Sequence, residues 1–192
     1  MSKKEAQMIE QIAGVLEKRC GKDVSEEVMK GKDSVGSSKR DVAIWVKGAM
    51  DRMDGLVASD ERTAVMEECG RNCCAINKGV AIAFRKRRAK YGSLDAFLEN
   101  EIKKPRRGTK LSRKGNAIHF YYTPSQFGRG MRCYCRLVSA LPADETISPT
   151  YCMCSVGFVK SLWEQVLEKP VQARLIRSAL TGSDECEFEI RF

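Results

Sequence analysis

The chain has 192 residues, of which 43% are hydrophobic and 31% are charged, and its formal net charge is +9 at pH 7. This size predicts one globular domain, residues 1–192, that buries roughly 70% of the unfolded surface, which excludes a disordered chain and a fold that needs disulfides. No apolar run approaches the ~18 residues of a membrane span, and the N-terminus lacks the apolar core of a signal peptide. We therefore expect a cytoplasmic protein without a membrane partner.

Helical periodicity dominates residues 1–108, which we interpret as the helical part of the domain. Apolar side chains recur three and four residues apart in several segments, which is the spacing of one helix face. Ser59 is a suitable N-cap for one helix, and Pro105 ends the last. We expect helices over 5–17, 24–29, from Asp41, from Ser59, over 72–90 and from Ser93 to Pro105.

After Gly108 the pattern changes to short alternating or aromatic runs separated by turn residues, which is typical of strands. A helical spacing returns once, over residues 155–167. The sequence thus predicts an α+β fold in which a helical N-terminal half packs on an antiparallel sheet formed mainly by the C-terminal half, with 109–192 as the sheet-rich part. The strands are expected over 109–112, 117–123, 131–138, 171–179 and 186–192.

The excess positive charge lies in one segment. Twelve basic and three acidic side chains occur between Arg85 and Lys114, so this segment carries a net charge equal to that of the whole chain. It is either a solvated surface, with basic residues placed favourably at a helix C-terminus, or a patch that attracts nucleic acid. No recognition motif supports nucleic-acid binding, which ranks last among our hypotheses. The patch comprises Arg85, Lys86, Arg87, Arg88, Lys103, Lys104, Arg106 and Arg107.

Nine cysteines occur, seven of them in three tight groups. In a reducing compartment such thiols are packed, bound to metal or reactive, and the sequence leaves these three alternatives open. Residues two apart on a strand share a face, so Cys133 and Cys135 would present their sulfurs together. Cys152 and Cys154 precede the helix expected at 155, whose dipole would lower the pKa of the Cys154 thiol.

Converging thiolates suit a zinc ion, and they also suit an iron–sulfur cluster. Zinc is the cofactor that we consider. Cys69 and Cys73, four residues apart on one helix, are additional candidate ligands. The candidate metal ligands are Cys133, Cys135, Cys152, Cys154 and Cys186.

His119 is the single histidine, which excludes any mechanism that needs two. A lone histidine in a strand is usually a packing residue. As an alternative it lines a ligand pocket with aromatic side chains from the strands and the last helix. The candidate pocket residues are His119, Tyr121, Tyr151, Phe158 and Trp163.

The C-terminal stretch resembles a known superfamily. Cys152, Gly157-Phe158, Trp163, Lys169-Pro170-Val171 and the run from Gly182 to Phe188 are similar to the end of the 4-vinyl reductase domain. This superfamily also contains proteins like 2-aminothiazoline-4-carboxylate hydrolase and the aromatic-sensing domains of bacterial regulators. The three cysteine groups resemble those of a cysteine-rich, uncharacterised prokaryotic branch.

The resemblance implies an α+β small-molecule-binding fold, often dimeric, with an apolar pocket between helices and sheet. In phenol-sensing relatives a zinc ion is held at positions that correspond to Cys152, Ser178 and Cys186. Because Ser178 departs from that pattern, Cys154, Cys133 or Cys135 would have to complete the zinc site.

Three functions follow as hypotheses. The first is a small-molecule-binding, sensor-like domain, expected as a homodimer, with a cysteine cluster that binds zinc or another metal. The second is a hydrolase of a small heterocycle such as 2-aminothiazoline-4-carboxylate, acting through a cysteine or a metal-bound water. The third is nucleic-acid binding through 85–114. No catalytic residue is assigned, and the question of enzymatic activity stays open; the candidate bases are His119, Asp144, Glu145 and Glu164.

Overall fold

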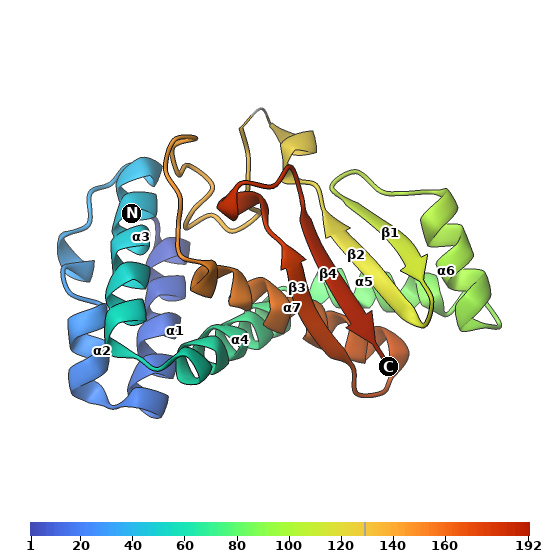
Figure 1. The fold of residues 1–192 in the computed structure, drawn as a ribbon, viewed down its shortest axis with the longest axis horizontal. Coiled ribbons are helices and arrows are strands. Elements are labelled where there is room, and N and C mark those ends of the chain that lie inside the picture. Colours follow the sequence, from blue (N-terminus) through green and yellow to red (C-terminus); the bar gives the residue numbers. More distant parts are fainter. Residues whose placement is uncertain (129) are drawn as a thin grey trace.

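The computed structural model describes residues 1–128 and 130–192 and has the expected α+β class (Figure 1). Seven α-helices and four strands are found in this part of the chain. The helices are α1 (Lys3–Cys20), α2 (Lys22–Val28), α3 (Lys39–Leu56), α4 (Ser59–Ile76), α5 (Lys78–Arg88), α6 (Leu94–Lys103) and α7 (Pro149–Leu167). The strands are β1 (Thr109–Lys114), β2 (Ala117–Tyr122), β3 (Gln172–Arg177) and β4 (Cys186–Arg191).

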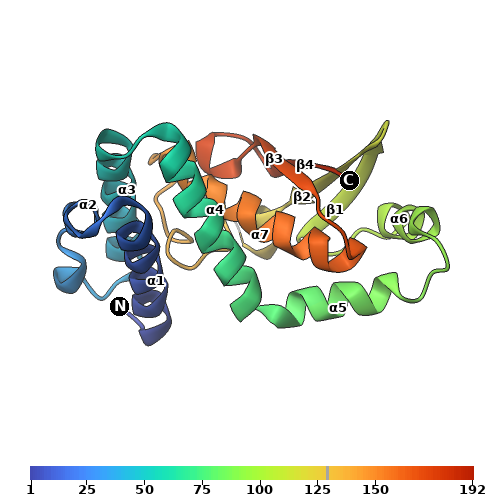
Figure 2. The ribbon, with the colours of Figure 1, turned by 90° about the horizontal axis from the view of Figure 1, so that it is seen from below.

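The strands form one antiparallel sheet in the order β1-β2-β4-β3. β1 and β2 are joined by a tight turn at Gly115, whose φ of 58° is accessible to glycine without strain. Phe192, expected on the same face as Phe188, lies beyond the end of β4 and is 43% exposed, and Glu187 and Glu189 of the other face are buried as well. Phe188 and Ile190 are fully buried on one face of β4, as the alternation predicts. This apolar face of the sheet lies against α7, with α5 beyond it (Figure 2).

Buried side chains form two clusters. One joins α1, α2, α3 and α4 to the segment from Leu137 to Cys152, and the other joins α5, α6 and α7 to the sheet. Met153 and Leu175 pack against both clusters. The helices α1 to α3 accordingly lie beside the sheet rather than on it (Figure 1).

α4 and α7 make the closest helix contact in the fold. At the crossing, Gly70 faces the backbone of Cys154 and Phe158, and Gly157 faces the backbone of Glu67. A side chain on either glycine would prevent this approach, so two glycines set the distance between the helices. Among the helices described, none combines the length and apolar character of a membrane span.

Three expectations about local structure are wrong. The segment 131–138 is not a strand: Leu137 and Val138 are buried in the first cluster, and Arg132 donates to the carbonyl of Glu145 at 2.8 Å. β2 pairs with β4 and with β1, not with this segment. Residues 72–90 do not form one helix, because the chain breaks at Asn77, whose side chain donates to the carbonyl of Cys73 at 2.8 Å.

The third wrong expectation concerns the residues at which α4 and α7 begin. Ser59 does not cap α4, which begins at Ser59 itself after Ala58 and has no side-chain cap. α7 begins at Pro149 rather than near 155, because the hydroxyl of Ser148 accepts from the backbone N–H of Thr150 and proline suits the first helical position. Cys152 and Cys154 therefore lie within the helix.

Candidate functional site

Cysteines from distant segments gather near the α4–α7 crossing. The pKa of the Cys154 thiol in α7 is raised well above the usual range, mainly by burial. Four neighbouring thiols raise it further, namely those of Cys135, Cys133, Cys73 and Cys69. This is the opposite of the expected lowering, because the half-buried sulfur lies within the helix, near other thiols, and not at the helix N-terminus.

Two hydrogen bonds hold the loop cysteines in place. The hydroxyl of Tyr151 donates to Sγ of Cys135 at 3.0 Å, and the backbone N–H of Cys135 lies 3.4 Å from Sγ of Cys133. Burial raises the pKa of both thiols. Both thiols are therefore neutral at pH 7. They lie in a loop and not on the strand that the sequence predicted.

A second group joins Cys152, Ser178 and Cys186, the three positions that the superfamily resemblance singled out. Sγ of Cys152 lies 3.1 Å from Oγ of Ser178, and Sγ of Cys186 lies 3.9 Å from the same oxygen. Burial raises the pKa of Cys152 to about 11. The structure thus brings the three side chains together as neutral hydrogen-bonding groups.

The donor chemistry of these thiols suits zinc, but their arrangement does not form a closed site. Over residues 1–128 and 130–192, no three histidine, cysteine or acidic side chains are placed to hold one metal ion. Four ligands at about 2.0–2.3 Å, as structural zinc requires, would need these side chains to lie closer together than they do here.

The five candidate pocket residues do not share a cavity in the structure. His119 and Tyr121 lie on the outer face of β2, whereas Trp163 is fully buried under the inner face of the sheet. Tyr151 belongs to the first cluster and Phe158 packs against the second. None of the five lines either cavity described below.

His119 is part of a hydrogen-bonding network on the outer face of the sheet. Its Nδ1 lies 2.7 Å from Oε1 of Glu187, which also accepts from the hydroxyl of Tyr121 at 3.1 Å and from Lys114 at 3.3 Å. Burial acts to raise the pKa of Glu187, but the hydrogen bonds from these three residues outweigh it and lower that pKa. A histidine engaged in this way serves the stability of the sheet.

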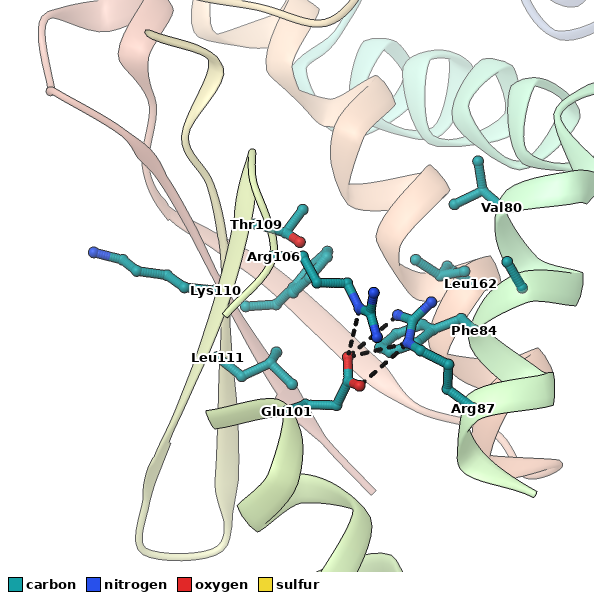
Figure 3. Close-up of a pocket in the computed structure, with 11 residues that line it drawn as sticks. Val80, Phe84, Arg87, Glu101, Arg106, Thr109, Lys110, Leu111 and Leu162 are labelled. Atoms are coloured by element: carbon teal, nitrogen blue, oxygen red, sulfur yellow. Dashed lines mark hydrogen bonds and ion pairs between the residues drawn. The ribbon is translucent and has the colours of Figure 1, made fainter. Parts of the chain in front are cut away.

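A cavity of about 160 Å³ lies between α5, α6, α7 and the β1–β2 edge of the sheet (Figure 3). Its interior is apolar, and its rim is charged. The apolar lining residues are Val80, Ala83, Phe84, Leu111, Phe120 and Leu162. The rim is made by Arg87, Glu101, Arg106, Thr109 and Lys110.

Glu101 is 6% exposed and joins the two arginines of the rim. It accepts hydrogen bonds of 3.2–3.3 Å from Arg87 and lies 3.7 Å from Nε of Arg106. The sequence named both arginines only as part of the basic patch and missed Glu101. The signal available was an acidic residue at the end of a helix, within an otherwise basic segment.

Residues of the basic patch have different partners in the fold. Arg87 and Arg106 face Glu101, and Arg85 pairs with Glu168 at 3.3 Å. Arg85, Lys86 and Arg88 line a second, open groove of about 720 Å³ between α5, α6 and the end of α7.

Comparison with known proteins gives a family but no activity. No curated protein matches the chain. Two crystal structures of an H-NOX protein from S. oneidensis, in the Fe(II)NO state and as an Fe(II) triple mutant, are 15% and 14% identical and have TM-scores of 0.43 and 0.46. They cover 97% of this chain, which covers 97% and 94% of theirs.

An NMR structure of the H-NOX domain from Shewanella oneidensis in the Fe(II)CO state is 16% identical, with a TM-score of 0.42 and coverage of 95% of this chain and 97% of that one. These scores are too low to transfer a ligand or cofactor. The sequence profile of a family of unknown function, DUF6144, matches residues 2–192, and the chain belongs to that family.

Proposed function

We propose that this chain is a small-molecule-binding, sensor-like domain whose ligand occupies the cavity between α5, α6, α7 and the sheet. The observation that carries the proposal is the combination of an apolar interior with a few charged groups at the rim, which is the usual chemistry of a ligand site. A dry cavity of about 150 Å³ accommodates a benzene molecule, so the volume of about 160 Å³ fits one small ring or a short branched chain.

The lining favours binding over the hydrolase alternative. The eleven residues that line the cavity include neither cysteine nor histidine. The cysteine groups lie elsewhere, and His119 is engaged by Glu187 on the opposite face of the sheet. The thiol and the histidine that the hydrolase hypothesis would use are thus missing from the lining that the structure describes, and recognition is the activity that the cavity supports.

Trp163 provides the test. Its ring packs edge-on against Phe84 at 5.2 Å and Phe120 at 6.0 Å, and both of these rings line the cavity. The other tryptophan, Trp45, is on α3 and donates to the carbonyl of Lys30. In a Trp45→Phe variant, the emission reports Trp163 alone, and a ligand in the cavity should change it.

We would titrate this variant with single-ring and short branched compounds, following emission and thermal unfolding. We expect a saturable change that Ala83→Leu, which narrows the cavity, abolishes. Ala89→Leu is the matched control, because Ala89 lies at the end of the same helix outside this cavity. Failure of every compound to give a saturable response, or equal responses in both leucine variants, would refute the proposal.

Zinc binding by the cysteines is the second candidate function. The gathering of thiols near the α4–α7 crossing supports it, with the loop that carries Cys133 and Cys135 adjusting to complete the site. Protein purified without chelator should then contain about one zinc ion per chain. Nine titratable thiols and no metal in the native protein would exclude this candidate.

A further inference from the structure

We propose that the ligand of this cavity is a small monocarboxylate, whose apolar part fills the interior and whose single negative charge pairs with Arg106. This inference rests on the proposed function, since it specifies the chemistry of the same site. The size of the cavity does not determine the charge of the ligand, so the inference is drawn from the charged side chains at the rim.

The rim holds one positive charge more than its own carboxylate can balance. Lys110 does not contribute, because its side chain points away from the cavity (Figure 3), pairs with Glu185 at 2.8 Å and lies over the ring of Tyr121. Two guanidinium groups then face one carboxylate, that of Glu101. A bound monoanion would neutralise the rim, whereas a neutral ligand would leave a positive charge beside an apolar interior.

The two arginines are not equivalent. Arg87 donates three hydrogen bonds to Glu101 and stacks over the ring of Phe84 at 4.5 Å, and its side chain is only 24% exposed. These contacts engage Nε and Nη2 and fix the position of the side chain. It therefore holds Glu101 in place rather than serving the ligand.

Arg106 is the arginine that remains available. Its side chain is 54% exposed, and its Nε lies 3.7 Å from Glu101, beyond hydrogen-bond distance. Within residues 1–128 and 130–192, its guanidinium makes no hydrogen bond. A carboxylate entering over Phe120 and Leu111 can take two parallel N–H donors from this group without breaking an existing bond.

The test compares single-ring ligands of different charge in the Trp45→Phe background. Benzoate and benzamide are nearly identical in size, and benzoate alone carries a charge at pH 7; phthalate carries two charges. We expect benzoate to bind at least about tenfold more tightly than benzamide, and more tightly than phthalate. Equal affinities for benzoate and benzamide would overturn the monocarboxylate inference and leave the proposed binding function standing.

Variants locate the charge. Arg106→Gln should remove the preference for benzoate while benzamide still binds, and Arg106→Lys should restore part of it. Lys104→Gln is the matched control, because it removes the same charge from an exposed side chain two residues away. Unchanged benzoate affinity in Arg106→Gln would refute the role of Arg106. Absence of a response to all three compounds would refute the inference, and absence of a response to the whole panel described above would refute the proposed function as well.

Discussion

The α4–α7 crossing gives the most direct test of the fold, because it depends on two glycines. In Gly70→Ala, the new Cβ would lie 2.7 Å from the backbone nitrogen of Phe158 and closer still to the carbonyl oxygen of Cys154. In Gly157→Ala, it would lie 2.7 Å from the carbonyl carbon of Glu67. Normal contact begins near 3.5 Å, and the carbonyl oxygens are the nearest atoms, so the helices must separate by more than an ångström in either variant.

The clash is with backbone, which cannot rotate away as a side chain can. Overpacking of a core costs about 1–3 kcal/mol, and we expect the upper end of that range, about 3 kcal/mol, for each variant. For a domain of this size the loss corresponds to a decrease of about 6–12 °C in melting temperature. Because both substitutions force the same separation, the double variant should lose less than twice the single loss.

Urea unfolding measures these changes, with Gly14→Ala as the control. Gly14 is an exposed glycine inside α1 with open space where its Cβ would lie, so alanine there should stabilise the protein by about 0.5–1 kcal/mol. The three substitutions are chemically identical, and their opposite signs follow from position alone. If Gly70→Ala were as stabilising as Gly14→Ala, the close crossing would be wrong.

Three further predictions follow from named contacts. Burial raises the pKa of the Cys69 thiol to about 12, whereas the thiol of the unfolded chain ionises near 8.5. The stability that this thiol contributes is therefore fully present below pH 8.5 and falls by about 2 kcal/mol by pH 10. Urea midpoints measured across this pH range should fall less in Cys69→Ala than in the unchanged protein. Ser93→Ala should destabilise the protein by about 1 kcal/mol, because the hydroxyl of Ser93 accepts a hydrogen bond from the backbone N–H of Ala96. Ser59→Ala should change the stability little, because Ser59 caps no helix. Equal losses of stability in the two variants would contradict the capping assignment. Thr150→Val should cost about 1.5–3 kcal/mol in the same assay, since its hydroxyl donates to Asp54 at 2.6 Å and ties α7 to α3; no loss would mean that this bond does not stabilise the fold.

Much of the fold follows from local patterns in the sequence. The alternation of β4 predicts the face that carries Phe188 and Ile190, although it does not predict the burial of Glu187 and Glu189 on the other face. Gly115 marks the turn between β1 and β2. The errors arise where tertiary packing outweighs the local pattern. The alternation of 131–138 is as regular as that of a strand, but Leu137 and Val138 are needed in the first cluster, and β4 already occupies the position beside β2.

The candidate sites are harder to predict for a related reason. Glu101 and Arg87 are fourteen residues apart on different helices, so their pairing depends on the angle between α5 and α6, which no local pattern encodes. The pKa of Cys154 was predicted in the wrong direction because a helix start was misplaced by six residues. A local error in a boundary thus became an error of sign in the chemistry.

The two proposed sites share α7 but use different ends of it. Cys154, near the start of the helix, lies close to the thiols of other cysteines, including Cys133 and Cys135. Leu162, eight residues further along the helix, lines the cavity. At 1.5 Å per residue the two positions are about 12 Å apart along the axis. No residue of the cavity lining is a cysteine, so the charge of Arg106 and the chemistry of the thiols can be altered separately. Evidence for or against zinc therefore leaves the monocarboxylate site to be judged on its own contacts.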